Sequence, residues 1–545
     1  MDPVTFFAQE NSILQQDLGF VTLVSIAALV AILIRRIRLP YTVALVVVGL
    51  ILSFFPNFLN FTLSSDLILA ILVPPLLFEA TLHIRWEHLR NELGAVLLLA
   101  VGGTLLGTFL VGGIVMQALK LPLLAALAFG ALISATDPVA VIAFFRSLGV
   151  SKRLALLVEG ESLFNDGTSI VLFNLALGAA LAANENFTWQ TGVIEFFRVS
   201  LGGLAVGAVL GYAVSYLILK NVDDHLIETA TTVALAFGAF VAAEEFHLSG
   251  ILAVVTAGLM VGNIGSQNTS PTTQITLENF WEFMGFVVNS LVFLLLGLEV
   301  EISRLIANLT PSVVAIVAVL LSRVIIVYGF SWIYGRFLSP TRRIPMKFQH
   351  VMYWGGLRGA ISLALALTLT GRVFGPAIAQ ELRLMTFGVV LFTLLVQGIT
   401  IERLIQRLGL AAKPETEVEQ QRRQAILYAR QAGQRELSRL YRDGILFPDI
   451  WEAMATVYDE QIDQSKLALR DHLLKYPELE QEMYLQARER ALRAERQAIS
   501  DAARRGVISD DLHHQLIREA DNHLAALELL QTRRIQSGKE EEGSE

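Results

Sequence analysis

The chain has 545 residues, of which 54% are hydrophobic and only 17% charged, and its mean hydropathy is +0.55. These values exclude an ordinary soluble globular protein and indicate one that crosses a membrane several times. The absence of cysteine excludes disulfides and cysteine-ligated metals. The net charge is −8, and about half of the charged side chains follow Leu410. We therefore expect membrane lipid around the first three quarters of the chain, water around the rest, and no nucleic-acid partner.

Apolar runs of roughly 17 to 25 residues predict about thirteen membrane-spanning helices. Residues 1–16 are acidic and lack the positive start of a cleaved signal peptide, so the first run is expected to be retained as a span. The break at 246–248 is the weakest of the predicted boundaries. The expected spans are 18–35, 41–55, 65–82, 93–118, 121–145, 153–182, 194–218, 227–246, 248–264, 279–298, 309–337, 346–371 and 383–405.

The distribution of Lys and Arg predicts the orientation, because cytoplasmic loops carry an excess of these residues. Stretches 1–17, 56–64 and 183–193 contain none. Lys120 and Arg304 on the outer side, and the inner loop 263–278, which has no Lys or Arg, weaken the pattern without reversing it. We expect a multi-pass protein of the plasma (inner) membrane, with the N-terminus outside and the C-terminal tail in the cytoplasm. The basic loops contain Arg35, Arg36, Arg38, Arg85, Arg90, Arg146, Lys152, Arg153, Lys220, Arg342, Arg343 and Lys347.

The densest polar cluster within an apolar run spans 159–168. Ser162 and Asp166 stand four residues apart and share one face of a helix, while Glu161 and Asn165 share a neighbouring face. A hydroxyl and a carboxylate are hard oxygen ligands suited to a small cation, and the second carboxylate needs a partner if it is buried. Helix capping or a structural ion pair at the membrane edge is the alternative. A charge at bilayer depth costs roughly 2.5 to 3.5 kcal/mol, which favours a functional site.

Two predicted spans, the fifth and the twelfth, contain helix-breaking motifs. Pro138 removes a backbone donor in mid-span, and glycines at 355–359 loosen the later span. Irregular backbone at that depth is tolerated where it lines a cavity or is buried in protein, and a matched pair is typical of transporters built from inverted repeats. Asp137 and Arg358 are placed to offset the partial charges of half-helices that cross. A simple kink is the alternative for either motif alone.

Two further charges lie in apolar segments. Arg323 needs an anionic partner, and Glu161 is the best unpaired candidate. Glu79 closes a proline-bent span, where it is either a second cation ligand or an interfacial residue.

Five motifs, in order along residues 20–405, resemble those of the cation:proton antiporter-1 family, which contains the bacterial NhaP-type antiporters and the eukaryotic sodium/proton exchangers. The resemblance implies a homodimer of thirteen-helix subunits, each with a dimerisation domain and a mobile ion-carrying core that works by elevator-like alternating access. The motifs are Pro74-Pro-Leu-Leu-Phe-Glu79, Ala135-Thr-Asp-Pro-Val139, Gly160-Glu-Ser-Leu-Phe-Asn-Asp-Gly167, Phe246-His-Leu-Ser-Gly-Ile-Leu252 and Gly355-Gly-Leu-Arg-Gly-Ala360.

The resemblance also implies a set of ligands. Asp166 resembles the essential cation- and proton-binding aspartate of the family. Ser162, the Thr136 main chain and Glu79 resemble the accessory ligands of that family. Sodium is therefore expected at these three residues and Asp166.

Five more residues resemble supporting groups of the family. Glu161 and Arg323 resemble its buried ion pair. Asn165 and Asp137 resemble polar groups that bridge the crossed helices, and Arg358 resembles the arginine of the unwound twelfth helix.

These residues predict a secondary transporter that exchanges sodium for protons, with both ions competing for Asp166. Because Asn165 does not titrate, we expect one titrating carboxylate and electroneutral one-for-one exchange. A carboxylate and a hydroxyl also suit lithium and potassium, so potassium/proton antiport is the alternative, and a cation channel is less favoured. No nucleophile-elbow or zinc-motif spacing supports an intramembrane hydrolase. We expect no enzymatic activity and no cofactor.

The last part of the chain has the pattern of amphipathic, charge-rich helices. We expect a transmembrane antiporter domain at 1–410 and a cytosolic helical tail at 411–545, with helical hairpins at 418–475 and 480–535 packed as a small bundle. Residues 442–450 resemble 505–512, and in each copy Gly ends one helix while Asp449 or Ser509 suits the cap of the next. Regulation, with an unidentified partner, or dimer contact is the expected role; a solubilising appendage is the alternative.

Overall fold

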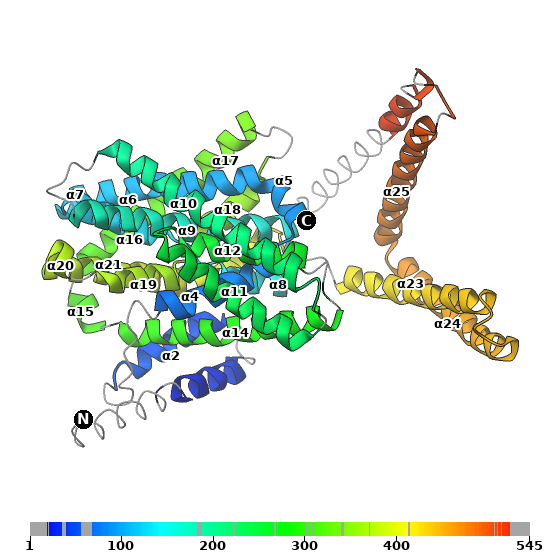
Figure 1. The fold of residues 1–545 in the computed structure, drawn as a ribbon, viewed down its shortest axis with the longest axis horizontal. Coiled ribbons are helices and arrows are strands. Elements are labelled where there is room, and N and C mark those ends of the chain that lie inside the picture. Colours follow the sequence, from blue (N-terminus) through cyan, green and yellow to red (C-terminus); the bar gives the residue numbers. More distant parts are fainter. Residues whose placement is uncertain are drawn as a thin grey trace. The chain divides into compact units, whose positions relative to one another are not determined.

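The computed structural model divides into two compact units, with the boundary between Ala412 and Lys413, close to the boundary predicted after residue 410. Every regular element among the described residues is a helix (Figure 1). The structure describes residues 19, 21–34, 40–55, 68–181, 188–222, 224–265, 269, 271–300, 302–307, 309–338, 343–369, 371–411, 415–505, 507–509, 511–513 and 515–523.

Among the described residues of the first unit, eight helical segments are long and apolar enough to cross a membrane, and four shorter apolar helices accompany them. Together with a pair of half-helices at 346–354 and 360–368, they lie within the thirteen predicted segments or overlap them. The prediction of an all-α polytopic membrane protein is therefore confirmed. The long segments are Trp86–Leu119, Leu123–Leu148, Lys152–Leu181, Trp189–Ile218, His225–Glu245, Thr272–Glu299, Leu309–Phe337 and Pro376–Arg407, and the short ones are Val21–Ile34, Tyr41–Leu52, Ala70–Leu82 and Gly250–Gly265.

Six of these segments are composite, because a π-helical stretch joins or extends their α-helices. They are η1 (Ile68–Leu72) with α4 (Val73–Leu82); α5 (Trp86–Leu97), η2 (Leu98–Gly102) and α6 (Gly103–Leu119); α10 (Trp189–Ala213) with η3 (Val214–Ile218); α12 (Gly250–Met260) with η4 (Val261–Gly265); α16 (Leu309–Val324), η5 (Ile325–Gly329), α17 (Phe330–Ile333) and η6 (Tyr334–Leu338); and α21 (Pro376–Phe392), η8 (Thr393–Gln397) and α22 (Gly398–Arg407). The other helices are α2 (Tyr41–Leu52), α7 (Leu123–Ser134), α8 (Val139–Leu148), α9 (Lys152–Leu181), α11 (His225–Glu245), α14 (Pro271–Glu299), α15 (Ile302–Ala307), α18 (Met346–Trp354), α19 (Ala360–Thr368) and α20 (Gly371–Phe374).

Local sequence signals set several helix ends. The Asp224 carboxylate accepts two backbone N–H groups in the first turn of α11, at 2.9 and 3.2 Å. The Ser249 hydroxyl caps α12 in the same way, which separates α11 from α12 at the weakest predicted break. Gly149 ends α8 with a φ of 64°, a conformation that glycine adopts without strain.

Small residues allow close contact between α10 and α12. A Cβ atom added to Gly207 would overlap the backbone of Ala253. Lipid tails are as apolar as the helix surfaces, so no hydrophobic force drives helices together in a membrane. They associate instead through close packing, which small residues allow. The stripe pairs Gly203 with Ser249, Gly207 with Ala253 and Gly211 with Ala257.

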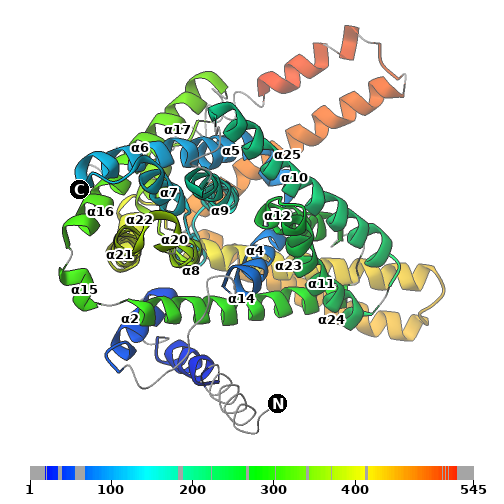
Figure 2. The same cartoon turned by 60° about the vertical axis from the view of Figure 1, so that its left-hand side comes forward.

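Two broken helices cross beside α9. α7 ends at Ser134 and α8 begins at Val139, while α18 ends at Trp354 and α19 begins at Ala360. The backbone N–H of Asp137 donates to the Leu357 carbonyl at 2.8 Å, so the two non-helical stretches touch. α7 packs along α9 (Figure 2). Both breaks lie where the proline and glycine motifs predicted them.

The second unit contains α23 (Glu415–Arg442), α24 (Pro448–Lys475) and α25 (Pro477–Arg504), followed by helical residues 511–513 and 515–523. α23 and α24 form a hairpin: Gly444 has a φ of 72°, and the Ile445 N–H donates to the Leu440 carbonyl at 2.9 Å. Arg496 pairs with Asp521 at 2.6 Å. Residues 524–535 of the second predicted hairpin lie outside the described residues, and the packing of both hairpins into one bundle stays a prediction.

The predicted cap at Asp449 is wrong. α24 begins two residues earlier than that cap implies, with Phe447 at the N-cap, and Asp449 lies in the first turn. The reason is Pro448, whose fixed φ and missing N–H suit the first helical position.

Candidate ion-binding site

Four polar side chains lie near the middle of the 30-residue helix α9. Glu161, Ser162, Asn165 and Asp166 are between 2% and 8% exposed. The sequence placed them on two neighbouring helix faces, and both faces are turned into the protein. A buried polar group needs a partner, so the contacts of each side chain define its role.

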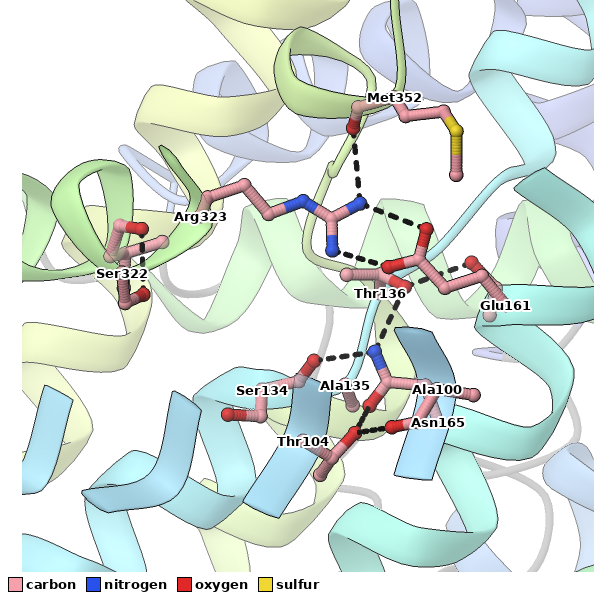
Figure 3. A network of polar contacts seen from close by, with 12 residues as sticks. Ala100, Thr104, Ser134, Ala135, Thr136, Glu161, Asn165, Ser322, Arg323 and Met352 are labelled. Atoms are coloured by element: carbon pink, nitrogen blue, oxygen red, sulfur yellow. Dashed lines mark hydrogen bonds and ion pairs between the residues drawn. The ribbon is translucent and has the colours of Figure 1, made fainter. Parts of the chain in front are cut away.

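Asn165 joins α9 to α6 and to the broken end of α7 (Figure 3). Its Nδ2 donates to the Ser134 carbonyl at 2.8 Å and to the Thr136 hydroxyl at 3.2 Å. Its Oδ1 accepts from Thr104 at 2.5 Å, and the same hydroxyl also contacts the Ala100 carbonyl. The amide thus uses both its donor and its acceptor to hold the non-helical stretch against α9.

Arg358 covers the C-terminal end of α7. Its Nη1 donates to the carbonyls of Ser134 and Ala135 at 2.6 and 3.0 Å. Its backbone N–H donates to the Thr393 hydroxyl at 3.1 Å, at the start of the π-helical stretch η8. A cation is favourable at a helix C-terminus, where carbonyl groups lack helical partners. Arg358 therefore lies where the helix-dipole argument predicted.

Asp137 covers the other half-helix. Its Oδ1 accepts the Val139 N–H at 2.9 Å, at the N-terminus of α8. A Cβ atom on Gly359 would overlap the Asp137 side chain, so the approach of the two broken segments depends on that glycine. Each half-helix end therefore lies beside a side chain of the opposite charge, with Asp137 at the N-terminus of α8 and Arg358 at the C-terminus of α7.

Glu161 and Arg323 form a buried ion pair (Figure 3). Arg323 donates from Nη1 to Oε1 and from Nη2 to Oε2, the second at 3.2 Å, and Nη2 also donates to the Met352 carbonyl at 3.0 Å. The pair connects α9 with α16 and with the end of α18. The sequence argument that Arg323 needs Glu161 thus agrees with the observed contact.

Asp166 is the exception on α9. It is 8% exposed and forms no hydrogen bond or ion pair with any described residue. Its neighbours on the cavity wall include Ser162 and Thr136, whose hydroxyl oxygens lie 2.9 Å apart. A buried carboxylate without a partner is expensive, so this position calls for a cation or a proton.

Asp166 lines a cavity of about 350 Å³ between α9, the α7–α8 break, α4, α14 and α19. Its polar lining comprises Tyr41, Thr42, Glu79, His83, Thr136, Asp137, Arg146, Glu159, Ser162, Asp166, Glu282, Asn289 and Ser362. Most of these polar side chains carry carboxylates or hydroxyls, which suit a hard cation.

Glu79 lies on the same cavity but is not among the charged neighbours of Asp166, which are Asp137 and Arg358. The charged neighbours of Glu79 are His83, Arg146 and Glu282. Glu159, which shares the first two of these, lies two helical turns before Asp166 on α9. Glu79 therefore belongs with the carboxylates at the Glu159 level of the cavity.

Sequence reasoning missed three polar contacts of the site. The Thr104 hydroxyl donates to Asn165 Oδ1, the Ser134 main-chain carbonyl accepts from Asn165 Nδ2, and the Ser362 hydroxyl donates to the Leu132 carbonyl at 2.8 Å across the crossing. A single Ser or Thr in an apolar helix carries no signal, because such side chains commonly bond to their own helix. Only the contacts between helices reveal them.

Crossed broken helices in a multi-pass helical protein, with an unpaired buried carboxylate on a cavity, define the class of secondary ion transporters. The sequence model of the family described as sodium/hydrogen exchanger, transmembrane, matches residues 23–407. The chain therefore belongs to the sodium/hydrogen exchanger family, and the resemblance predicted from the five motifs is confirmed.

Individual relatives agree with this assignment. The Na⁺/H⁺ antiporter ApNhaP of Aphanothece halophytica is 41% identical over 399 residues, covering 73% of this chain and 74% of the relative. The Na⁺/H⁺ antiporter NhaG of Bacillus atrophaeus is 34% identical over 508 residues, covering 91% and 94%. The solved structure of the sodium proton antiporter MjNhaP1 from Methanocaldococcus jannaschii at pH 8 has a TM-score of 0.59 at 21% identity and covers 73% of this chain and 99% of that chain. The last comparison shows a shared fold.

Proposed function

We propose that this protein exchanges sodium for protons across the membrane, with both ions competing for Asp166. The observation that carries the proposal is the buried Asp166 carboxylate, which lines a cavity and has no hydrogen-bond or ion-pair partner among the described residues. Burial favours the protonated form of a carboxylate, whereas a bound cation favours the ionised form. One side chain then holds either ion, and exchange follows from competition. The names of the relatives support the choice of sodium and proton.

The proposed cation ligands are oxygen atoms around Asp166. Ser162 and Thr136 support this assignment, because their hydroxyl oxygens lie 2.9 Å apart on the cavity wall. We assign the Thr136 main chain as a further ligand. Glu79 completes the proposed set when the cavity narrows around the ion, since in this structure it lies at the level of Glu159.

Five residues support this site without holding the ion in the proposal. Asn165, Asp137 and Arg358 fix the crossed half-helices through the contacts described above. Glu161 and Arg323 neutralise each other inside the protein.

The proposed exchange is electroneutral, with one cation per proton. The Asn165 amide does not titrate and is fully engaged by hydrogen bonds, so Asp166 alone takes up and releases the proton. We expect exchange in vesicles to be insensitive to a clamped membrane potential. Exchange that accelerates when the potential is applied would contradict this stoichiometry.

The remaining features of the proposal concern the whole transporter. Each subunit has thirteen spans arranged as inverted repeats, and two subunits form a homodimer in the plasma (inner) membrane. The N-terminus lies outside and the tail in the cytoplasm. A mobile core around α7, α9 and α19 carries the ion by alternating access. The matched breaks of α7–α8 and α18–α19 support the inverted repeat.

The tail is proposed to regulate exchange or to contact the second subunit. Deletion of residues 415–545 tests this role, because regulation predicts a shifted pH profile of exchange in membranes. An unchanged profile with reduced solubility of the protein would favour the solubilising appendage.

The proposed function is tested in proteoliposomes that contain a pH-sensitive dye. Sodium, lithium and potassium salts are added in turn, and we expect proton efflux with sodium and none with potassium. A larger signal with potassium would make the protein a potassium/proton antiporter. Sodium flux without proton counterflow would identify a channel and contradict the proposal.

A further inference from the structure

A second cavity, of about 540 Å³, adjoins the ion cavity at the ends of α4, α5 and α9. Its volume lies within the range of about 300 to 1,000 Å³ that is usual for ligand sites. The two cavities share His83, Ile84 and Glu159. The lining residues are His83, Ile84, Arg85, His88, Asn91, Glu92, Lys152, Arg153, Ala155, Leu156 and Glu159.

The charges of this second cavity favour an anion. Arg153 and Glu92 neutralise each other through two hydrogen bonds, at 2.9 and 3.1 Å. Arg85 and Lys152 are exposed and form no ion pair with any described residue. Of the acidic lining residues, only Glu159 lacks an ion pair among the described contacts, and it also faces the ion cavity. Two basic groups therefore remain available to a ligand.

The wall that carries these groups is held in place. Asn263 of η4 accepts the Trp86 N–H at 2.7 Å and donates to the Ile84 carbonyl at 2.9 Å. These two bonds flank Arg85 on both sides. The backbone at Arg85 is therefore already ordered, which lowers the cost of binding a ligand there.

The position of the cavity indicates the source of the anion. Trp86 begins the membrane-spanning segment Trp86–Leu119 and is 48% exposed. Exposed Trp at the end of a span is typical of the membrane–water interface, where phospholipid headgroups lie. Basic pockets between the ends of membrane helices bind anionic headgroups. We propose that the second cavity binds the phosphate group of an anionic phospholipid, with Arg85 and Lys152 as its main contacts.

This site has a consequence for transport that rests on the proposed function. A phosphate held beside His83 and Glu159 places negative charge next to the ion cavity. Negative charge near a cation path raises the local cation concentration. Anionic lipid is therefore expected to lower the KM for sodium without changing the maximal rate.

The binding step is tested on the full chain, purified and delipidated in detergent, by titration with phosphatidylglycerol and with phosphatidylcholine. The test variant is Arg85→Gln with Lys152→Gln. The matched control is Arg90→Gln, which removes an exposed charge of α5 that does not line the cavity. We expect the tightest phosphatidylglycerol site to weaken about 25-fold in the double variant, since one basic residue contributes about fivefold, and to remain unchanged in the control.

Three outcomes would overturn the inference. Unchanged binding in the double variant would exclude this cavity, and an equal loss in Arg90→Gln would indicate a general charge effect. Displacement of the lipid by inorganic phosphate at equal concentration would make free phosphate the ligand.

Transport provides the separate second measurement. In the unmodified protein the KM for sodium should be lower in phosphatidylglycerol than in phosphatidylcholine vesicles; the double variant should lose this difference between the two lipids, whereas Arg90→Gln should keep it. If the unmodified protein binds lipid at the cavity but exchanges no ions, the proposed function fails and the lipid site stands. If it exchanges ions but the double variant binds lipid normally, the lipid site fails alone.

Discussion

Two stretches of α9 carry buried acidic side chains, and their surroundings treat them in opposite ways. Glu161 receives two hydrogen bonds from Arg323, which is itself anchored to the Met352 carbonyl. Asp166, little more than one helical turn later, lines a cavity and receives no hydrogen bond from any described residue. Both carboxylates are less than one tenth exposed, so burial alone does not distinguish them.

These two carboxylates of α9 are therefore suited to different roles, one structural and one in transport. A paired carboxylate is stabilised only while its partner stays in place, so Glu161 is unsuited to release and rebind an ion. An unpaired carboxylate pays for its desolvation whenever it is empty, so Asp166 favours occupation by a proton or a cation. The contrast predicts that changes at the two stretches fail in different ways.

The largest effect is expected for Asp166→Asn. The amide keeps the shape of the side chain but cannot release a proton or balance a cation, so exchange should be abolished. Stability should not fall, because the change removes a buried charge that has no partner. Proton efflux from vesicles measures the first effect, and thermal unfolding in detergent measures the second.

Residual sodium/proton exchange in the Asp166→Asn variant would contradict the proposal that Asp166 binds the exchanged ions. A matched control is Asp224→Asn, which lies outside the membrane segments and caps α11. It should leave exchange intact, since Asn is also a good N-cap.

Arg323→Ala tests the structural end of the comparison. It leaves Glu161 charged and buried without a partner, a change that costs about 3 to 5 kcal/mol. We expect a strong loss of folded protein, measured by the yield and thermal stability of the purified variant. A normally stable Arg323→Ala protein would contradict the structural role of the pair.

Removing both charges sharpens the same test. Apolar replacement of a buried pair is often neutral or stabilising, so Glu161→Leu with Arg323→Met should recover most of the lost stability. If the pair is structural, sodium/proton exchange should return with the fold. A stable double variant without exchange would place Glu161 or Arg323 in the ion site.

Much of this contrast could be predicted from the sequence. The broken helices follow from Pro138 and the glycines at 355–359, because backbone chemistry decides them locally. The partnership of Arg323 with Glu161 follows from elimination, since few buried charges are available. The helix positions follow from the lengths of the apolar runs.

The rest depends on how separate helices are rotated and shifted against each other, which periodicity does not determine. The level of Glu79 in the cavity, the hydroxyl of Thr104 behind Asn165 and the whole second cavity belong to this group. The role of Asn165 as a bridge came from the family resemblance. The cap of α24 was mispredicted because Pro448 outweighs Asp449 as a helix start.

A smaller effect is expected for Asn165→Ala, which removes the bridge between α9 and the broken end of α7. The loss should cost about 1 to 3 kcal/mol, because buried polar groups lose a partner. Exchange should slow, since Thr136 loses its contact with Asn165. Thr104→Val is the control, because Asn165 keeps both of its donor bonds; it should retain nearly native exchange rates in vesicles, and an equal slowing would place Thr104 in the ion site.

The smallest effect is expected for Ser162→Ala, compared with Ser169→Ala on the same helix. Both serines are buried. Ser162 lines the ion cavity, whereas Ser169 does not line it and donates to the Ala131 carbonyl at 2.5 Å. Loss of one neutral ligand should raise the KM for sodium about tenfold in Ser162→Ala, on the scale of one hydrogen bond, while Asp166 keeps the maximal rate. Ser169→Ala should lower stability by about 1 kcal/mol and leave the KM unchanged. Equal KM values in the two variants would show that the cation is held by Asp166 without the hydroxyl of its own helix face.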